Sequence, residues 1–256
     1  MTIDWDNVPA AVWRPRSGRL RAVRRLDHVR LEHLLGVERQ KRELVANTER
    51  FLARQPAHNA LLWGSRGTGK SSLIKALLNE YANRGLRVVE MDKSDLVDLP
   101  EIVDDLREVP HRFIIFCDDL SFEEGETHYK HLKSVLEGSI ELPPENVLVY
   151  ATSNRRHLIP ERSAENAETR IVDGELHYGD TVEEKLSLAD RFGLWLSFHP
   201  NSLAQYLAIV DYLFADHRVD RDELHRRAKE FAMTRATKSG RTARQFYISW
   251  WGNGGA

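Results

Sequence analysis

The sequence has few of the features that mark secreted, membrane-spanning or nucleic-acid-coating proteins. Its 256 residues include a single cysteine, Cys117, which excludes an internal disulfide and any zinc site built from several thiolates. No apolar run approaches the ~20 residues that span a bilayer, and the acidic start, with Asp4 and Asp6, is unlike a secretory signal. Neither sign of charge is in excess: 37 Lys and Arg stand against 39 Asp and Glu, which argues against a histone-like or polybasic protein. We therefore expect a cytoplasmic protein of a reducing compartment.

Short apolar runs alternate with segments of helical hydrophobic period along residues 35–152. Hydrophobic residues make up 41% of the chain, which is enough for a core. Short apolar runs predict strands at 59–63, 86–91, 112–117 and 147–152. The segments between them have a helical period and predict helices at 35–52, 70–84, 99–107 and 129–137. Strands that alternate with helices predict an α/β fold with a parallel sheet and crossover helices.

The same pattern divides the chain into three regions. We expect an irregular arm at 1–34, an α/β domain at 35–193 and an all-helical domain at 194–256. Within the second region, Asp173 and Gly174 lie between β-prone flanks and predict a hairpin at 170–178. The helices of the third region are predicted at 202–214, 220–233 and 242–250, with Asp220 capping the second of them.

The arm is rich in arginine and poor in acids. Between residues 14 and 30 a single acid, Asp27, accompanies Arg14, Arg16, Arg19, Arg21, Arg24, Arg25 and Arg30. These arginines either contact nucleic acid, a phosphate or an acidic partner, or only form a solvated surface. The composition by itself favours the solvated surface.

The strongest motif is the loop that connects the strand at 59–63 with the helix from residue 70. It matches G-x-x-x-x-G-K-[ST] at every fixed position, and the strand before it and the helix after it are the context that this motif requires. Glycines let backbone N–H groups surround phosphate oxygens, Lys70 reaches the β- and γ-phosphates, and the Ser71 hydroxyl is a Mg²⁺ ligand. The predicted nucleotide-binding residues of the loop are Gly64, Ser65, Arg66, Gly67, Thr68, Gly69, Lys70, Ser71 and Ser72.

Polar residues follow two further predicted strands. Asp118 and Asp119 come directly after the apolar run 113–117, and Asn154 ends the run from 147. Ligands of α/β sheets lie beyond the carboxyl ends of the strands, so these side chains are expected near the phosphates. Asp118 is the predicted Mg²⁺ ligand, Asp119 the base for the attacking water, and Asn154 a residue that helps to place this water. Alone, the two acids could equally cap a turn, and a terminal Asn is more often a turn former.

In this order the motifs resemble the AAA+ ATPases. The strings 184–198 (EKLSLADRFGLWLSF) and 62–73 (LWGSRGTGKSSL) resemble a bacterial AAA+ family called domain of unknown function 815. The resemblance covers residues 31–251. It implies a P-loop core with a small C-terminal helical lid, ATP and Mg²⁺ as ligands, and a homo-oligomer that acts on a protein or nucleic-acid client.

The resemblance also assigns further site residues. Leu35, Gly36 and Val37 match the segment that contacts adenine. Arg191, in Asp190-Arg191-Phe192, matches the arginine finger that enters a neighbour's site. Arg244 matches the second sensor, with Arg241 as the less favoured candidate. Asp119 stands where most AAA+ proteins have glutamate. An aspartate at this position is similar to the replicative-helicase loaders, and its shorter side chain implies slow or partner-stimulated hydrolysis.

Three functions are compatible with these residues. The favoured one is ATP hydrolysis coupled to remodelling or switching of a macromolecular partner. The second is an ATP-switched DNA-binding module of the helicase-loader type, which the arginine-rich arm suggests. The third is a monomeric small-molecule kinase, against which the arginine at 191 argues.

Overall fold

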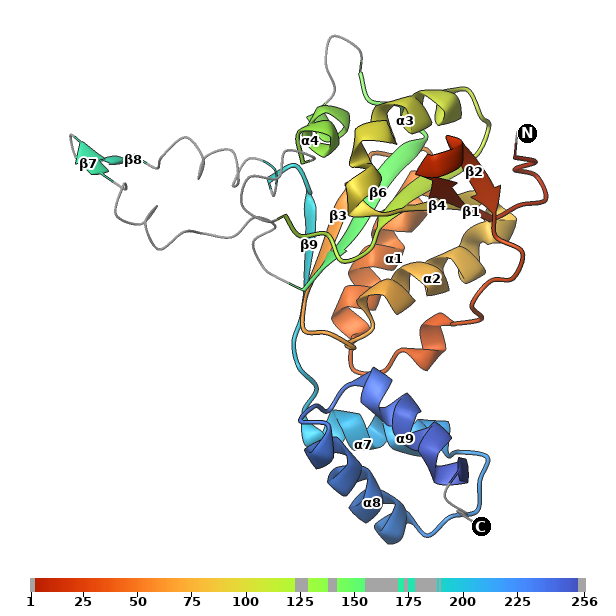
Figure 1. Cartoon of the computed structure of the whole chain (residues 1–256), viewed down its shortest axis with the longest axis vertical. Coiled ribbons are helices and arrows are strands. Elements are labelled where there is room, and N and C mark those ends of the chain that lie inside the picture. The colour runs from red at the N-terminus through yellow and green to blue at the C-terminus, as the bar shows by residue number, and fades with distance from the viewer. Residues whose placement is uncertain are drawn as a thin grey trace.

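The chain folds around one large sheet. The computed structural model describes residues 3–122, 129–137, 142–154, 170–172, 175–177, 188 and 190–252. The seven strands of the sheet have the order β2-β1-β4-β5-β6-β3-β9 (Figure 1). Six of them run parallel to one another, and five of these form the body of the sheet: β3 (Ala60–Gly64), β4 (Leu86–Met91), β5 (Arg112–Cys117), β6 (Val147–Ser153) and β9 (Leu194–Phe198). The predicted parallel α/β sheet is thereby confirmed.

Helices cover both faces of the sheet. One face packs on α1 (Glu38–Leu52) and α2 (Lys70–Tyr81), and the other on α3 (Leu99–Arg107) and α4 (Tyr129–Glu137). Successive residues of a strand point to opposite faces of the sheet. Ile114 accordingly packs with α1 and α2, and Ile115 packs with α3 and α4. Strands buried on both faces explain the nearly continuous apolar runs of the sequence. Short 3₁₀ helices lie at Pro15–Ser17, Leu31–His33, Ala82–Arg84 and Lys93–Asp98.

The expectation of an irregular arm at 1–34 is wrong for part of that segment. β1 (Ala10–Arg14) lies parallel to β4, and β2 (Arg19–Ala22) lies antiparallel to β1, so the arm extends the sheet by two strands. Ala10 and Ala11 are buried against the body of the sheet. This pairing joins residues about 80 positions apart, Ala11 with Val89, and such tertiary contacts leave little local pattern.

The predicted boundary at 193 is also wrong. β9 follows it and pairs with β3, so the α/β domain continues to Phe198. A five-residue apolar run beside a helical region cannot be assigned to strand or helix from its period alone. The small hairpin is confirmed: β7 (Arg170–Val172) and β8 (Glu175–His177) pair antiparallel, while residues 173–174 lie outside the described residues.

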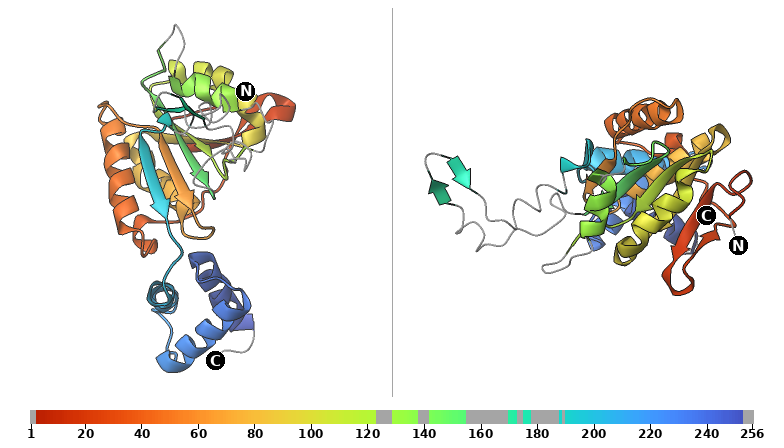
Figure 2. Two further views of the ribbon diagram at one scale, coloured as in Figure 1. Left: turned by 90° about the vertical axis from the view of Figure 1, so that its left-hand side faces the viewer. Right: turned by 90° about the horizontal axis from the view of Figure 1, so that it is seen from above.

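The C-terminal region is a bundle of α7 (Leu203–Leu213), α8 (Arg221–Thr234) and α9 (Gly240–Gly252). It lies beyond the carboxyl end of β9 and is separate from the helical layers of the sheet (Figure 2). Tyr206, Phe214 and Phe246 fill its core. The predicted cap is confirmed, because the Asp220 carboxylate accepts a hydrogen bond from the backbone N–H of Glu223.

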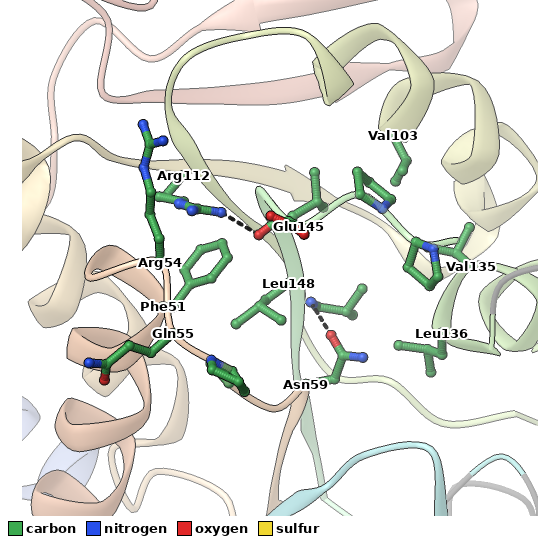
Figure 3. Close-up of a pocket in the computed structure, with 16 residues that line it drawn as sticks. Phe51, Arg54, Gln55, Asn59, Val103, Arg112, Val135, Leu136, Glu145 and Leu148 are labelled. Carbon is green, nitrogen blue, oxygen red and sulfur yellow. Dashed lines mark hydrogen bonds between the residues drawn. The ribbon is translucent and has the colours of Figure 1, made fainter. Parts of the chain in front are cut away.

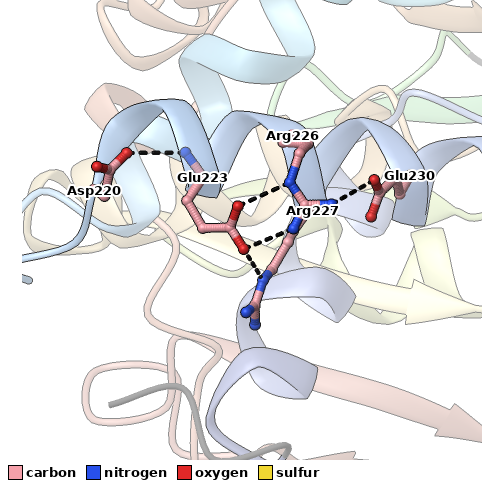
Figure 4. A network of polar contacts seen from close by, with 5 residues as sticks. All are labelled: Asp220, Glu223, Arg226, Arg227 and Glu230. Atoms are coloured by element: carbon pink, nitrogen blue, oxygen red, sulfur yellow. Dashed lines mark hydrogen bonds and ion pairs between the residues drawn. The ribbon is translucent and has the colours of Figure 1, made fainter.

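An ion-pair network lies on the surface of α8 (Figure 4). The Glu223 carboxylate accepts hydrogen bonds from Arg226 and Arg227, and these bonds lower its pKa to about 2. Across the described parts of the chain, no helix is both long enough and apolar enough to cross a membrane.

Candidate functional site

The loop between β3 and α2 has a backbone that only glycine allows at its key positions. Gly64 has φ +129°, and a Cβ there would lie 2.0 Å from the carbonyl oxygen of Phe198. Gly67 has φ +75°, and a Cβ there would lie 2.7 Å from the Ser239 hydroxyl of the helical domain. The loop is therefore pressed between the end of β9 and the start of α9. Its shape agrees with the predicted phosphate-binding loop.

Lys70 begins α2 and turns its ammonium group back onto this loop. Its Nζ donates hydrogen bonds to the carbonyl oxygens of Gly64 (2.7 Å) and Ser65 (2.8 Å) and to Oδ1 of Asn154 (3.1 Å). The residue is 7% exposed, and burial lowers the pKa of the ammonium group, an effect that the nearby carboxylates of Asp118 and Asp119 oppose. A buried cation at the end of such a loop is a suitable partner for phosphate oxygens.

The two predicted acids lie at the same edge of the sheet as the loop. The Ser71 hydroxyl donates a hydrogen bond of 2.7 Å to Oδ1 of Asp118. A hydroxyl and a carboxylate in contact are hard oxygen ligands of the kind that Mg²⁺ accepts, so these two residues fit the predicted metal position. Asp119 accepts a hydrogen bond from the side-chain amide of Asn154, whose Oδ1 in turn accepts from Lys70. The structure thus joins Lys70, Asn154 and Asp119 in one chain of hydrogen bonds.

Thr152 is a site residue that the sequence analysis missed. It lies on β6, is 1% exposed, and its hydroxyl donates to Asp118 while it accepts from the backbone N–H of Asp119 at 2.9 Å. One side chain therefore orients both acids. Asp119 also has φ +53°, a left-handed conformation that Asp tolerates better than most residues. The strand register could have revealed Thr152, because Cys117 pairs with Ala151 and the next residues on both strands are then neighbours.

These groups open into a cavity of about 1180 Å³ between the sheet and the helical domain. Of the predicted residues, it is lined by Leu35, Val37, Arg66, Gly67, Thr68, Gly69, Lys70, Ser71, Ser72, Asp118, Asp119, Asn154 and Arg244. Three further residues of the predicted nucleotide-binding set lie elsewhere. Gly36 faces Gln205 of α7, and the carbonyl oxygens of Gly64 and Ser65 accept hydrogen bonds from Lys70. The cavity therefore has a loop for phosphates at one side and apolar residues of the 26–37 segment and α7 at the other.

The segment that follows β2 forms a second wall that the sequence analysis missed. Asp27 pairs with Lys75 of α2 at 3.2 Å, and the Asn79 side-chain amide donates to the carbonyl oxygens of Asp27 and Val29, each at 2.7 Å. The ring of His33 lies 6.0 Å from that of Tyr212 on α7. The segment thus connects the helix that begins at Lys70 with the helical domain.

Both candidate arginines of α9 line the cavity. Gly240, at the start of α9, donates its N–H to the carbonyl oxygen of Gly67 at 3.1 Å. The charge of Arg241 is close enough to contribute to the lowered pKa of Lys70. Arg244, the favoured candidate, lies one turn further along the helix. Its role as the second sensor stays a prediction.

Arg191 is not brought to this cavity. It precedes β9, in which Leu194 pairs with Ala60 at the start of β3 and Phe198 pairs with Gly64 at its end. Arg191 therefore lies at the amino end of the parallel strands, and five strand residues separate it from the loop by about 16 Å. There its Nε contacts Oε1 of Glu137 at 2.7 Å.

A second cavity of about 390 Å³ lies at the amino ends of β5 and β6 (Figure 3). Its wall is mostly apolar, and the Arg112 guanidinium lies 5.3 Å from the centre of the Phe51 ring. Its lining includes none of the residues that form the phosphate-binding loop or the acid pair. None of the predicted site residues therefore lines the second cavity.

The fold is that of the AAA+ P-loop ATPases. A RuvB variant from Thermotoga maritima aligns with 86% of this chain and 72% of its own at 14% identity and a TM-score of 0.52. The FIGL-1 AAA domain, solved in complex with ADP, aligns with 80% of this chain and 68% of its own at 18% identity and a TM-score of 0.52.

The family of the chain is shown by its sequence. A family model described as "Protein of unknown function (DUF815)" matches residues 6–254, and the chain belongs to this family. The large subunit of replication factor C from Ignicoccus hospitalis is 37% identical over 68 residues, which are 26% of this chain and 14% of that protein. The chain thus matches only a small part of this curated relative.

Proposed function

We propose that the protein is a cytoplasmic, Mg²⁺-dependent ATPase that hydrolyses ATP to ADP and phosphate and uses this reaction to remodel or switch a macromolecular partner. The observation that carries the proposal is the chain of hydrogen bonds from Lys70 through Asn154 to Asp119, beside the Ser71–Asp118 contact. A cation for phosphates, a metal position and a base for water meet at one edge of the sheet. This set of groups matches the needs of phosphoryl transfer to water.

Each residue has a separate task in this reaction. Lys70 exchanges its loop carbonyls for β- and γ-phosphate oxygens, and Asn154 keeps Lys70 and Asp119 at a fixed separation. Asp119 accepts a proton from the attacking water. Ser71 and Asp118 hold Mg²⁺, which neutralises charge on the phosphates. Arg244 and Arg241 approach from the helical domain, so that closure of this domain over the nucleotide adds positive charge.

The position of Arg191 supports an oligomer. An arginine at the amino end of the strands cannot reach the γ-phosphate of its own copy across about 16 Å. It can reach the site of a neighbouring copy that presents its carboxyl edge to this surface. We therefore propose a homo-oligomer in which Arg191 completes the neighbour's site in trans.

Phosphate release by the purified protein tests the proposal. We expect Mg²⁺-dependent release from ATP that Asp119→Asn abolishes while binding of the nucleotide is retained, since the amide keeps the shape and lacks the base. Parental turnover by Asp119→Asn would place the base elsewhere. The mass of the protein with a non-hydrolysable ATP analogue tests the oligomer, and a monomer under all conditions contradicts it.

A second candidate function, DNA binding switched by ATP, has one specific observation in its favour. β2 is an edge strand, and Arg19 stands directly across from Arg14 of β1, a like-charge pair that destabilises a hairpin unless an anion lies on it. Among the described residues, no carboxylate forms an ion pair with Arg14, Arg16, Arg19, Arg24 or Arg25. Replacing Arg19, Arg21 and Arg24 with Ala should weaken binding to duplex DNA. The slope of log affinity against log salt concentration should become shallower by about 3, which is about 1 for each lost phosphate contact. Binding that is unchanged by this triple replacement removes this candidate.

A further inference from the structure

The side chain of Arg191 forms one ion pair within the described residues. Its Nε contacts Oε1 of Glu137, and no other part of its guanidinium group has an ion-pair partner among the described residues. Within the described part of the chain, the two terminal Nη atoms therefore have no ion-pair partner. The recorded contact joins one carboxylate oxygen to Nε, whereas a bidentate pair joins both oxygens to two nitrogens of the guanidinium group.

Glu137 sits on an anchored element. It ends α4, whose Leu132 is fully buried against the sheet and whose turns pack along α3. The Glu137 side chain is 29% exposed, whereas that of Arg191 is 46% exposed and belongs to the connection before β9. The carboxylate also lies 3.8 Å from Lys133 Nζ, one turn earlier on α4. The carboxylate thus belongs to a helix that packs on the sheet, and it contacts the arginine from there.

We infer that Glu137 is a positioning residue for Arg191, which holds the Nε side of the guanidinium group so that its Nη atoms face the γ-phosphate of a neighbouring copy. This inference rests on the proposed role of Arg191 in trans. A long arginine side chain loses much rotamer freedom when it is fixed, and a partner that fixes it beforehand removes that loss from the reaction. Loss of Glu137 should lower turnover roughly tenfold, the factor that the rotamer freedom of one arginine represents.

Mixed oligomers test this inference separately from the proposal on which it rests. Lys70→Ala supplies an intact arginine with a defective loop, and Arg191→Ala supplies an intact loop without the arginine. A mixture of the two should regain ATP turnover. If it remains inactive although both variants bind one another, Arg191 does not act in trans, and the proposed role and the inference both fail.

The active mixture then locates the effect of Glu137. Adding Glu137→Ala to the Lys70→Ala protein should lower the kcat of the mixture about tenfold and leave KM unchanged, because the nucleotide binds to the other copy. Adding Glu137→Ala to the Arg191→Ala protein should change nothing. Equal losses in both arrangements would show a structural role for Glu137, and a gain in the first would show that it sequesters the arginine; either result overturns the inference.

Two further variants complete the experiment. Glu137→Gln keeps an oxygen that accepts from Nε and should retain most of the activity that Glu137→Ala loses. Asp104→Ala removes a matched exposed carboxylate, which pairs with Arg107 on the neighbouring α3, and should leave the mixture unchanged. A Glu137→Gln variant as impaired as Glu137→Ala, with both folded by circular dichroism, contradicts positioning through this contact with Nε.

Discussion

The two ends of the parallel strands differ in what they can do alone. At the carboxyl end, the loop, the acid pair, Thr152 and Asn154 are joined by short hydrogen bonds and enclosed by the helical domain. At the amino end, Arg191 and Glu137 form an ion pair on the surface, beside no phosphate-binding loop. Under the proposed function, the carboxyl end holds the nucleotide, and the amino end supplies a single catalytic group, Arg191, to another copy. The proposed function therefore predicts that one copy binds the nucleotide by itself, whereas turnover requires both ends and hence two copies.

The largest expected effect is at the carboxyl end. Lys70→Ala removes the buried ammonium group on which the phosphates depend, and we expect ATP binding to weaken by about 100-fold or more, since charge-assisted hydrogen bonds are among the strongest in proteins. Isothermal titration calorimetry measures this change. Lys229→Ala, on the exposed surface of α8, is the matched control and should bind like the parent. Equal affinities of Lys70→Ala and the parent would mean that the nucleotide binds elsewhere.

The next effect is at the amino end and separates binding from turnover. Arg191→Ala should bind ATP with parental affinity but hydrolyse it about 10³-fold more slowly or worse, the range of arginine fingers. Calorimetry and phosphate release on the same preparation check both halves. A loss of affinity equal to the loss of turnover would contradict the separation of the two ends.

A smaller effect is expected at the residue that orients both acids. Thr152→Val keeps the shape of the side chain but leaves the N–H of Asp119 without its acceptor and removes one of the two hydroxyl donors to Asp118, which we expect to cost about 1–3 kcal/mol of stability. Turnover should fall more than nucleotide affinity. Thr152→Ser, which keeps the hydroxyl, should retain activity. Thermal melting measures the stability of the two variants, and phosphate release measures their turnover. If Thr152→Ser were as inactive as Thr152→Val, the role of Thr152 would lie in the packing of its methyl group and not in its hydroxyl.

The smallest effect lies outside both ends, on α8. The pKa of Glu223 is lowered to about 2, so its carboxylate stabilises the folded protein above its ordinary pKa of 4.5, and this contribution is lost as pH falls from 4.5 towards 2. Glu223→Gln should therefore lower Tm slightly at pH 7, and the difference from the parent should disappear in acid. Because the group lies at the surface, solvent screens the interaction and the shift in Tm is small. Melting curves at several pH values measure it, and a difference that grows in acid would contradict the sign.

Most of the binding site could be predicted because its signals are local or follow from the topology. The loop motif is continuous in sequence, and Asp118, Asp119 and Asn154 end neighbouring parallel strands, which brings them to one edge. Thr152 was missed because its two hydrogen bonds depend on the register of β6 against β5.

The remaining misses depend on contacts between distant segments. β1 and β2 are strands only because β1 pairs with β4, and β9 belongs to the sheet only because it pairs with β3. The wall at 25–34 is held by Asn79, about 50 residues later in the chain. None of these contacts has a period or a motif that a single sequence displays.

The dependence of turnover on protein concentration tests the central claim most directly. Phosphate release per subunit should rise with concentration and reach a plateau as the oligomer forms, since each site needs Arg191 of another copy. Arg191→Ala should show no such rise at any concentration, although it is folded and binds ATP. A protein that remains monomeric and turns over ATP at the same rate per subunit at every concentration would contradict the account and favour the monomeric small-molecule kinase.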